Sequence, residues 1–456
     1  MGRRTSWMFS IGLVLIGAWA ISIPALAEQE GSLEERLKAI EEKLTVLEEE
    51  NESLRQSNKE LQERLRVIEG RPEPQGEEQQ SVKAPGALEK KEPSLGEKAG
   101  APSPIVERLK EWVERVRFFG DMRLRYEGIF QKDLPADRHR HRVRLRLGAT
   151  VKISDQLEAG IRVATGDPDD PTTTNQTFTD FFSRKPLDLD RFYLTYRPFK
   201  ALTLTGGKFQ NPFKSTEMIW DEDVQPEGLA ETLTFREVGP LKTVTLVGGQ
   251  FVLSEVAAAT DSAMFGWQVI LEATPSKDLT LALAGAYYDF EKTDRIARAL
   301  ATGDLKSGNT NRTTGTGAET RFLSDFRIVN VLGQVDYKLG TVPLRLIASY
   351  AHNTGASDKN DGYWLEAYVG GLRKKGEFRV GYGFALVETD AALSAFNSDD
   401  WLDTNIRTHM ADLAYQLFDN TTLKLEGFFI EENDLEDPGI GRGLRTRVRL
   451  NVIVRF

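Results

Sequence analysis

Arginine occupies every second position in several stretches of this sequence, which is the spacing that places side chains on one face of a β-strand. Apolar residues such as Leu124, Val143 and Leu145 fill the alternate positions. The arginines of these stretches are Arg123, Arg125, Arg138, Arg140, Arg142, Arg144, Arg146, Arg445, Arg447 and Arg449. Guanidinium groups bind carboxylates, phosphates and similar anions. This pattern therefore predicts a basic face that needs acidic side chains, water or passing anions as partners.

Acidic residues that could face these arginines are concentrated between residues 211 and 225. They are Glu217, Asp221, Glu222 and Asp223. We expect this stretch to be a loop that folds inward, because like-charged guanidinium groups in a narrow space repel one another and need compensation.

The elements that carry these residues are β-strands. From about Arg117 onward apolar residues alternate with polar ones, and the last stretch, 443–456, shows this most clearly. We predict sixteen strands in pairs: 117–128 and 138–153, 157–166 and 187–198, 201–210 and 226–236, 242–253 and 263–274, 278–290 and 324–338, 342–351 and 361–373, 376–388 and 403–417, and 421–431 and 443–456.

The connections between these strands alternate in length. Long polar connections such as 167–186 and 291–323 lie within the pairs, and short turns such as 154–156 and 340–341 lie between them. This asymmetry is typical of outer-membrane barrels, which have short periplasmic turns and long external loops. We therefore predict an all-β transmembrane barrel of about sixteen antiparallel strands over residues 116–456.

Closure of such a barrel makes the last strand a neighbour of the first two, so the arginines would form one patch on the lumen wall. If the acidic loop faces this patch, the constriction has charges of both signs, which sets ion preference. Two interpretations remain open. The arginines attract anions into the pore, or they form a structural network with carboxylates and selectivity is weak.

The first 115 residues have a different organisation. Residues 1–27 read as a signal peptide, with Arg3 and Arg4 before an apolar stretch and a small-residue cleavage site at 25–27; an uncleaved anchor is the alternative. Residues 28–69 carry apolar heptads and predict a periplasmic coiled coil, with Asn51 and Asn58 as polar a positions that restrict register. Residues 70–115 form a Pro- and Gly-rich linker and a short helix.

Composition excludes several classes of protein. The 456 residues include no Cys and only four His, so thiolate metal sites and Cys nucleophiles are excluded, and we predict no cofactor or metal. No Ser–His pair is readable, so we predict no enzyme. The net charge of -10 argues against nucleic-acid binding. Asp399 and Asp400 are interpreted as solvated loop charges, with calcium binding as the alternative.

The barrel portion resembles the putative porin family of Gram-negative bacteria. The similar runs are 118–127 (FFGDMRLRYE), 207–213 (GKFQNPF), 220–223 (WDED) and 226–228 (PEG). The run 207–213 is also similar to the phosphate-selective porins. The terminal Phe456 closes an alternating strand, as the outer-membrane assembly signal does. The resemblance implies a passive diffusion channel. It also implies the partners of such a channel: the lipid bilayer with lipopolysaccharide, two further copies in a homotrimer, and small solutes or anions.

The alternative to a channel is a structural tether, in which the coiled coil contacts peptidoglycan and the barrel is only an anchor. Both interpretations place the chain in the outer membrane with its coiled coil in the periplasm. The mean hydropathy of -0.39 suits a barrel, because half of each strand faces water.

Overall fold

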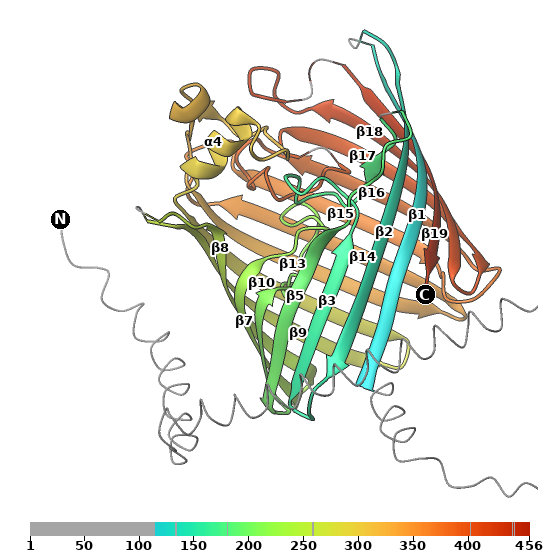
Figure 1. Ribbon diagram of the computed structural model, residues 1–456. Helices are drawn as coiled ribbons and strands as arrows, with labels where there is room; N and C mark the ends of the chain where they lie inside the picture. Colours follow the sequence, from blue (N-terminus) through green and yellow to red (C-terminus); the bar gives the residue numbers. More distant parts are fainter. Residues whose placement is uncertain are drawn as a thin grey trace, which may run out of the picture. The chain divides into compact units, whose positions relative to one another are not determined.

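The computed structural model describes residues 115–132, 135–179, 181–257, 260–401, 403–439, 441 and 443–456. They form a closed antiparallel β-barrel (Figure 1). The predicted signal peptide, the coiled coil with Asn51 and Asn58, and most of the linker lie outside the described residues.

Sixteen long strands make the barrel, which confirms the predicted strand number and antiparallel order. The strands are β1 (Val116–Gln131), β2 (Arg138–Lys152), β3 (Leu157–Ala164), β5 (Asp188–Phe199), β6 (Leu202–Lys208), β7 (Glu227–Val238), β8 (Leu241–Ser254), β9 (Ser262–Ser276), β10 (Leu279–Glu291), β13 (Phe326–Leu339), β14 (Val342–Asn353), β15 (Asp361–Gly370), β16 (Phe378–Val387), β17 (Ile406–Phe418), β18 (Thr421–Glu432) and β19 (Arg445–Arg455).

Short elements lie in the long loops. They are β4 (Gln176–Thr177), the helix α4 (Asp294–Thr302), β11 (Thr313–Thr314), the 3-10 turn η1 (Gly317–Glu319) and β12 (Arg321–Phe322). At the opposite end the strands join through tight turns, where Gly239 and Gly340 have φ of 59° and 64°. Glycine adopts such left-handed angles without steric cost. The barrel therefore has a short-turn end and a long-loop end.

The barrel closes between β1 and β19. Pairing between these strands runs from Asp121 opposite Arg455 to Gln131 opposite Arg445. On its other side β1 pairs with β2, so that Glu127 lies opposite both Arg140 and Arg449. Figure 1 shows β19, β1 and β2 side by side on one face. We call the inward face of these three strands the arginine wall.

The outer face of the barrel is apolar. Leu124, Trp267 and Tyr382 are about half exposed, as expected for side chains that meet lipid tails and headgroups. Tyr196, Tyr337 and Tyr350, which the sequence also places outward, are exposed as well. No helix among the described residues is both long and apolar enough to cross a membrane.

The interior contains an apolar core that sequence reasoning did not predict. Three long loops supply it: loop 3 (residues 209–226), loop 5 (residues 292–325) and loop 7 (residues 388–405). Trp220 of loop 3 packs against Tyr288 of β10 and stacks on Phe396 of loop 7, with ring centroids 6.0 Å apart in the latter pair. Inward-facing Phe326 and Phe428 belong to the same cluster. Side chains of the three loops therefore pack with one another and with inward-facing strand residues.

Loops 5 and 7 are also joined by hydrogen bonds. The Asn311 amide donates to the carbonyl oxygens of Thr389, at 2.6 Å, and Ala392, at 2.8 Å. In return the backbone N–H of Ser394 donates to Asn311 Oδ1 at 2.8 Å. Because buried polar groups are costly when unpaired, these bonds fix one arrangement of the two loops.

Candidate functional site

The part of the arginine wall nearest the long loops is a buried ionic network. Glu127 accepts hydrogen bonds from Arg449 Nε, at 2.9 Å to Oε2, and from Arg140 Nε, at 3.0 Å to Oε1. Glu127 and Arg449 are both 0% exposed. β1 places Glu127 between the two arginines because they are its register partners on β19 and β2. One carboxylate thus joins the three strands across the closure.

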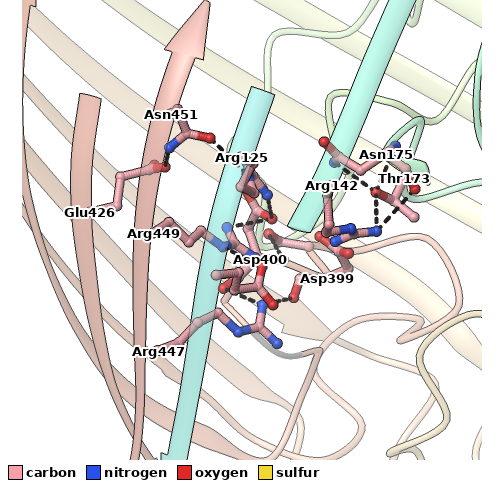
Figure 2. Close-up of polar contacts among 12 residues, drawn as sticks. Arg125, Arg142, Thr173, Asn175, Asp399, Asp400, Glu426, Arg447, Arg449 and Asn451 are labelled. Carbon is pink, nitrogen blue, oxygen red and sulfur yellow. Dashed lines mark hydrogen bonds and ion pairs between the residues drawn. The ribbon is translucent and has the colours of Figure 1, made fainter. Parts of the chain in front are cut away.

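Loop 7 completes this network with Asp400. Asp400 Oδ1 lies 2.6 Å from Arg449 Nη1 and 3.6 Å from Arg125 Nη1. Arg447 Nη1 donates to the carbonyl oxygen of Asp399 at 2.8 Å. Figure 2 shows both aspartates among these arginines, beside β1. The interpretation of Asp399 and Asp400 as solvated charges is therefore wrong, because loop 7 turns inward and packs them against the wall.

The two aspartates of loop 7 differ in acidity. Burial alone would raise the pKa of Asp400, but the guanidinium groups of Arg449 and Arg125 outweigh it and hold the pKa well below its usual range. Burial and the adjacent Asp400 raise the pKa of Asp399 to about 7. Burial also raises the pKa of Asp403 to about 7. Near neutral pH, Asp400 is therefore ionised, whereas Asp399 and Asp403 titrate.

Nearer the short-turn end, one carboxylate of β1 and one of loop 3 pair with the arginines of the wall. Asp121 accepts from Arg144 Nη2 and from Arg146 Nε, each at 2.6 Å. Asp223 of loop 3 accepts from Arg146 Nη1 at 3.0 Å through Oδ1. Its Oδ2 accepts from the backbone and hydroxyl of Thr174. Asp223 therefore fixes loops 2 (residues 165–187) and 3 to the wall.

The other three acids of loop 3 line a cavity that the wall also borders, but they form no ion pair with the wall among the described residues. Glu217 accepts a hydrogen bond from the Ser398 hydroxyl of loop 7 at 2.7 Å. Asp221 accepts the backbone N–H of Asp223 at 2.7 Å. Glu222 lies in the lining of an internal cavity. Of the four acids, Asp223 is the one that forms an ion pair with the wall in the part of the chain that the structure describes.

The cavity has a volume of about 1390 Å³ and lies between loop 3, the arginine wall and the turns of the short-turn end. Arg123, Arg125 and Arg146 of the wall line it. Arg162 of β3 and Arg191 of β5 line it too. Sequence reasoning missed these two, because each strand carries one inward arginine rather than a run. The register that pairs Arg162 with Arg191 would have revealed them.

The other arginines that the sequence predicts for the wall do not line this cavity. Arg138 is exposed at the long-loop end of β2. Arg142 Nη2 donates to the Asn175 carbonyl at 3.1 Å, and Arg445 Nε donates to Gln131 Oε1 at 2.6 Å. The backbone of Phe456 exchanges hydrogen bonds with Gly120, at 2.8 and 3.0 Å, which extends the closure of the barrel to the last residue.

Two arginines of the cavity have amide partners in place of carboxylates. Arg123 donates to Asn175 Oδ1, at 2.7 Å from Nη2. Arg191 donates to Gln225 Oε1 at 2.8 Å and to Gln210 Oε1 at 3.2 Å. Neither forms an ion pair with a residue in the described ranges. Amide oxygens satisfy the donors but, unlike carboxylates, carry no negative charge.

The acids across the cavity are poorly suited to compensate that charge. Burial, followed by neighbouring carboxylates, raises the pKa of both Glu217 and Asp221 well above the usual range. A carboxyl group held protonated carries no charge. The cavity therefore has an excess of positive charge on its wall.

Comparison with known proteins agrees with this architecture. A model of the family described as putative porin matches residues 130–318, which confirms the resemblance found in the sequence. Pseudomonas putida OprB is similar in structure, with 14% identity, a TM-score of 0.51, and coverage of 77% of this chain and 97% of that chain. This likeness shows the fold alone.

Two further solved structures are similar at lower scores. Salmonella typhi OmpF, in complex with daunomycin, has 10% identity, a TM-score of 0.48, and coverage of 75% of this chain and 97% of that chain. A loop-deletion mutant of OmpT, an outer membrane protein of Vibrio cholerae, has 13% identity, a TM-score of 0.45, and coverage of 75% and 99%. No curated protein matches the sequence.

Proposed function

We propose that this chain is an outer-membrane porin that lets small hydrophilic solutes diffuse passively and that prefers anions. The family match and the closed barrel support the channel. The anion preference rests on one observation: Arg123 and Arg191 line the cavity without a carboxylate partner among the described residues. The facing acids Glu217 and Asp221 have raised pKa values, so they offset this charge only weakly.

The two interpretations of the arginines apply to different parts of the wall. Near the long loops, Arg140, Arg447 and Arg449 belong to a buried network with Glu127 and loop 7, and their role is structural. Toward the short-turn end, Arg123 and Arg146 meet the cavity, where a permeating ion can reach them. Selectivity for anions thus needs only the arginines at the cavity, which are Arg123 and Arg146 of the wall together with Arg162 and Arg191.

A double variant tests the anion preference. Replacing Arg123 and Arg191 with Gln is expected to lower the chloride-to-potassium permeability ratio about fivefold. Each screened charge contributes roughly 0.5 kcal/mol to the difference in free energy between the two ions in the pore. The ratio is measured from reversal potentials in planar bilayers. Arg138→Gln, at the exposed rim, is the matched control and should change the ratio little. An unchanged ratio in the double variant would remove the assigned basis of the preference.

The acidity of loop 7 predicts a pH-dependent conductance. Asp399 and Asp403 have folded pKa values of about 7, above the ordinary value of 3.8. Between these pH values, loop 7 binds more protons when it is docked inside the barrel than when it is released into water. Docking therefore weakens as pH rises from about 4 through 7. The docking equilibrium then shifts by at most about tenfold per pH unit for each group.

We therefore expect single-channel open probability to rise between pH 5 and pH 8. The variant with Asp399 and Asp403 both replaced by Asn should lose this rise, because Asn mimics the protonated carboxyl at every pH. A conductance that falls over this range in the parent protein would contradict the assignment.

The N-terminal residues have a separate proposed role. The heptads of 28–69 would hold three barrels together from the periplasm, through partner helices. Deleting residues 28–103 distinguishes this role from a tether. We expect conductance to persist and the trimer mass in mild detergent to fall to that of a monomer. A deleted chain that no longer conducts, although its barrel remains folded, would favour the tether.

A further inference from the structure

Two residues that line the cavity have a buried hydrogen-bond donor without an acceptor. Arg162 Nη2 and Asn211 Nδ2 are buried and have no hydrogen-bond partner in the part of the chain that is described. The Arg162 side chain is 7% exposed, and its Nε is committed to Asp190. Both residues line the cavity. Buried donors without acceptors are rare and cost free energy, so each requires an explanation.

Arg191 is the cross-strand neighbour of Arg162, on β5 beside β3, and also lines the cavity. Its Nη1 donates to Gln210 Oε1 at 3.2 Å, and Gln210 precedes Asn211 in loop 3. Its Nη2 makes no hydrogen bond within the described ranges. Two guanidinium groups and one amide, all on residues that line the cavity, thus have N–H groups without an acceptor among the described residues.

This donor set fits an oxyanion. Guanidinium groups bind the planar oxygens of carboxylates and the oxygens of phosphates through charge-assisted hydrogen bonds. None of the three free groups can ligate a cation, because each of these nitrogens is a donor only. The cavity, at about 1390 Å³, is far larger than an isolated oxyanion. The remainder of a small organic solute therefore fits beside its charged group.

We propose that Arg162, Arg191 and Asn211 form a binding site for the carboxylate or phosphate group of a permeating solute. The proposal rests on the porin function above and identifies where the solute pauses on its path. The pairing of Arg162 with Asp190 holds the guanidinium in position, and loop 3 supplies the amide.

Two probes distinguish the sources of the oxyanion. Inorganic phosphate and succinate are each titrated into planar bilayers that contain the full chain at constant KCl. A bound oxyanion is expected to reduce the chloride current saturably. Loss of one charge-assisted bond should raise the half-blocking concentration about tenfold or more.

The test variant is Asn211→Asp. It keeps the Oδ1 acceptor that receives the Phe213 backbone N–H at 3.0 Å, and it replaces the free donor with a repelling carboxylate. Arg162→Gln is the second variant, although it also removes a buried ion pair. Arg138→Gln is the matched control. Isothermal titration of the detergent-solubilised proteins with each probe gives a readout that does not depend on conduction.

The outcomes separate the site from the channel. Saturable binding of phosphate, succinate or both, weakened in Asn211→Asp and unchanged in Arg138→Gln, supports the site. Which probe binds shows whether the site takes a phosphate or a carboxylate group. Equal binding in the parent and Asn211→Asp, or no heat and no block with either probe, overturns the site. If the parent still prefers chloride in that case, the porin function stands without it. A cation-preferring parent that binds neither probe would overturn both.

Discussion

Glu127→Gln is expected to lower the free energy of unfolding of the barrel by about 3 kcal/mol, the usual cost of breaking a buried ion pair. Glu127 joins Arg140 and Arg449 across the closure of the barrel, and neither Glu127 nor Arg449 is exposed. Glutamine has the same size but no charge, so both guanidinium groups lose the negative charge of Glu127. The effect lies at the lower end of the usual range because Asp400 still pairs with Arg449.

Urea unfolding in lipid vesicles measures this loss, with the retained electrophoretic mobility of unheated barrels as a second readout. Glu158→Gln is the control. Glu158 lies 3.9 Å from Arg197, and their side chains are 32% and 45% exposed. A pair of this kind contributes about 0.5 kcal/mol or less. Equal losses in the two variants would show that the buried network does not stabilise the closure.

Trp401→Ala is expected to release loop 7 and raise the conductance. Trp401 is 3% exposed, and its ring lies 4.1 Å from that of Trp364 and 5.9 Å from that of Phe428. Truncating a buried aromatic of this size costs about 3 to 5 kcal/mol. Most of that loss should weaken docking of the loop, because Trp401 is the aromatic contact between loop 7 and strands β15 and β18.

Single-channel conductance in planar bilayers and limited proteolysis of loop 7 test this prediction together. Leu435→Ala, at a position that is 56% exposed in the last long loop, is the control and should leave both unchanged. If loop 7 becomes cleavable while conductance stays the same, the loop is docked in the barrel but does not restrict the pore.

The strands could be predicted because the alternation of apolar and polar residues that specifies them is local in the sequence. Alternation of Leu124 with Arg123 and Arg125 fixes which face each side chain occupies, and closure then determines its neighbours. The arginine wall follows from parity alone.

The loops could not be predicted in this way. Trp220, Leu393 and Trp401 lie in irregular stretches without a period, so nothing local shows that they fold into the barrel. That folding decides which carboxylates meet the arginines. Asp400 of loop 7 pairs with Arg449, whereas three of the four acids of loop 3 face the arginines across the cavity and form no ion pair with them among the described residues. Arg162 and Arg191 were missed because a single inward arginine on a strand carries no repeating signal.

The reversal potential of the full-length protein in a KCl gradient tests the central claim most directly. The uncompensated charges of Arg123 and Arg191 predict a potential displaced toward the equilibrium potential of chloride, and a smaller displacement as salt is raised. A displacement toward the equilibrium potential of potassium would contradict the anion preference, and the absence of any conductance at pH 8 would contradict the channel.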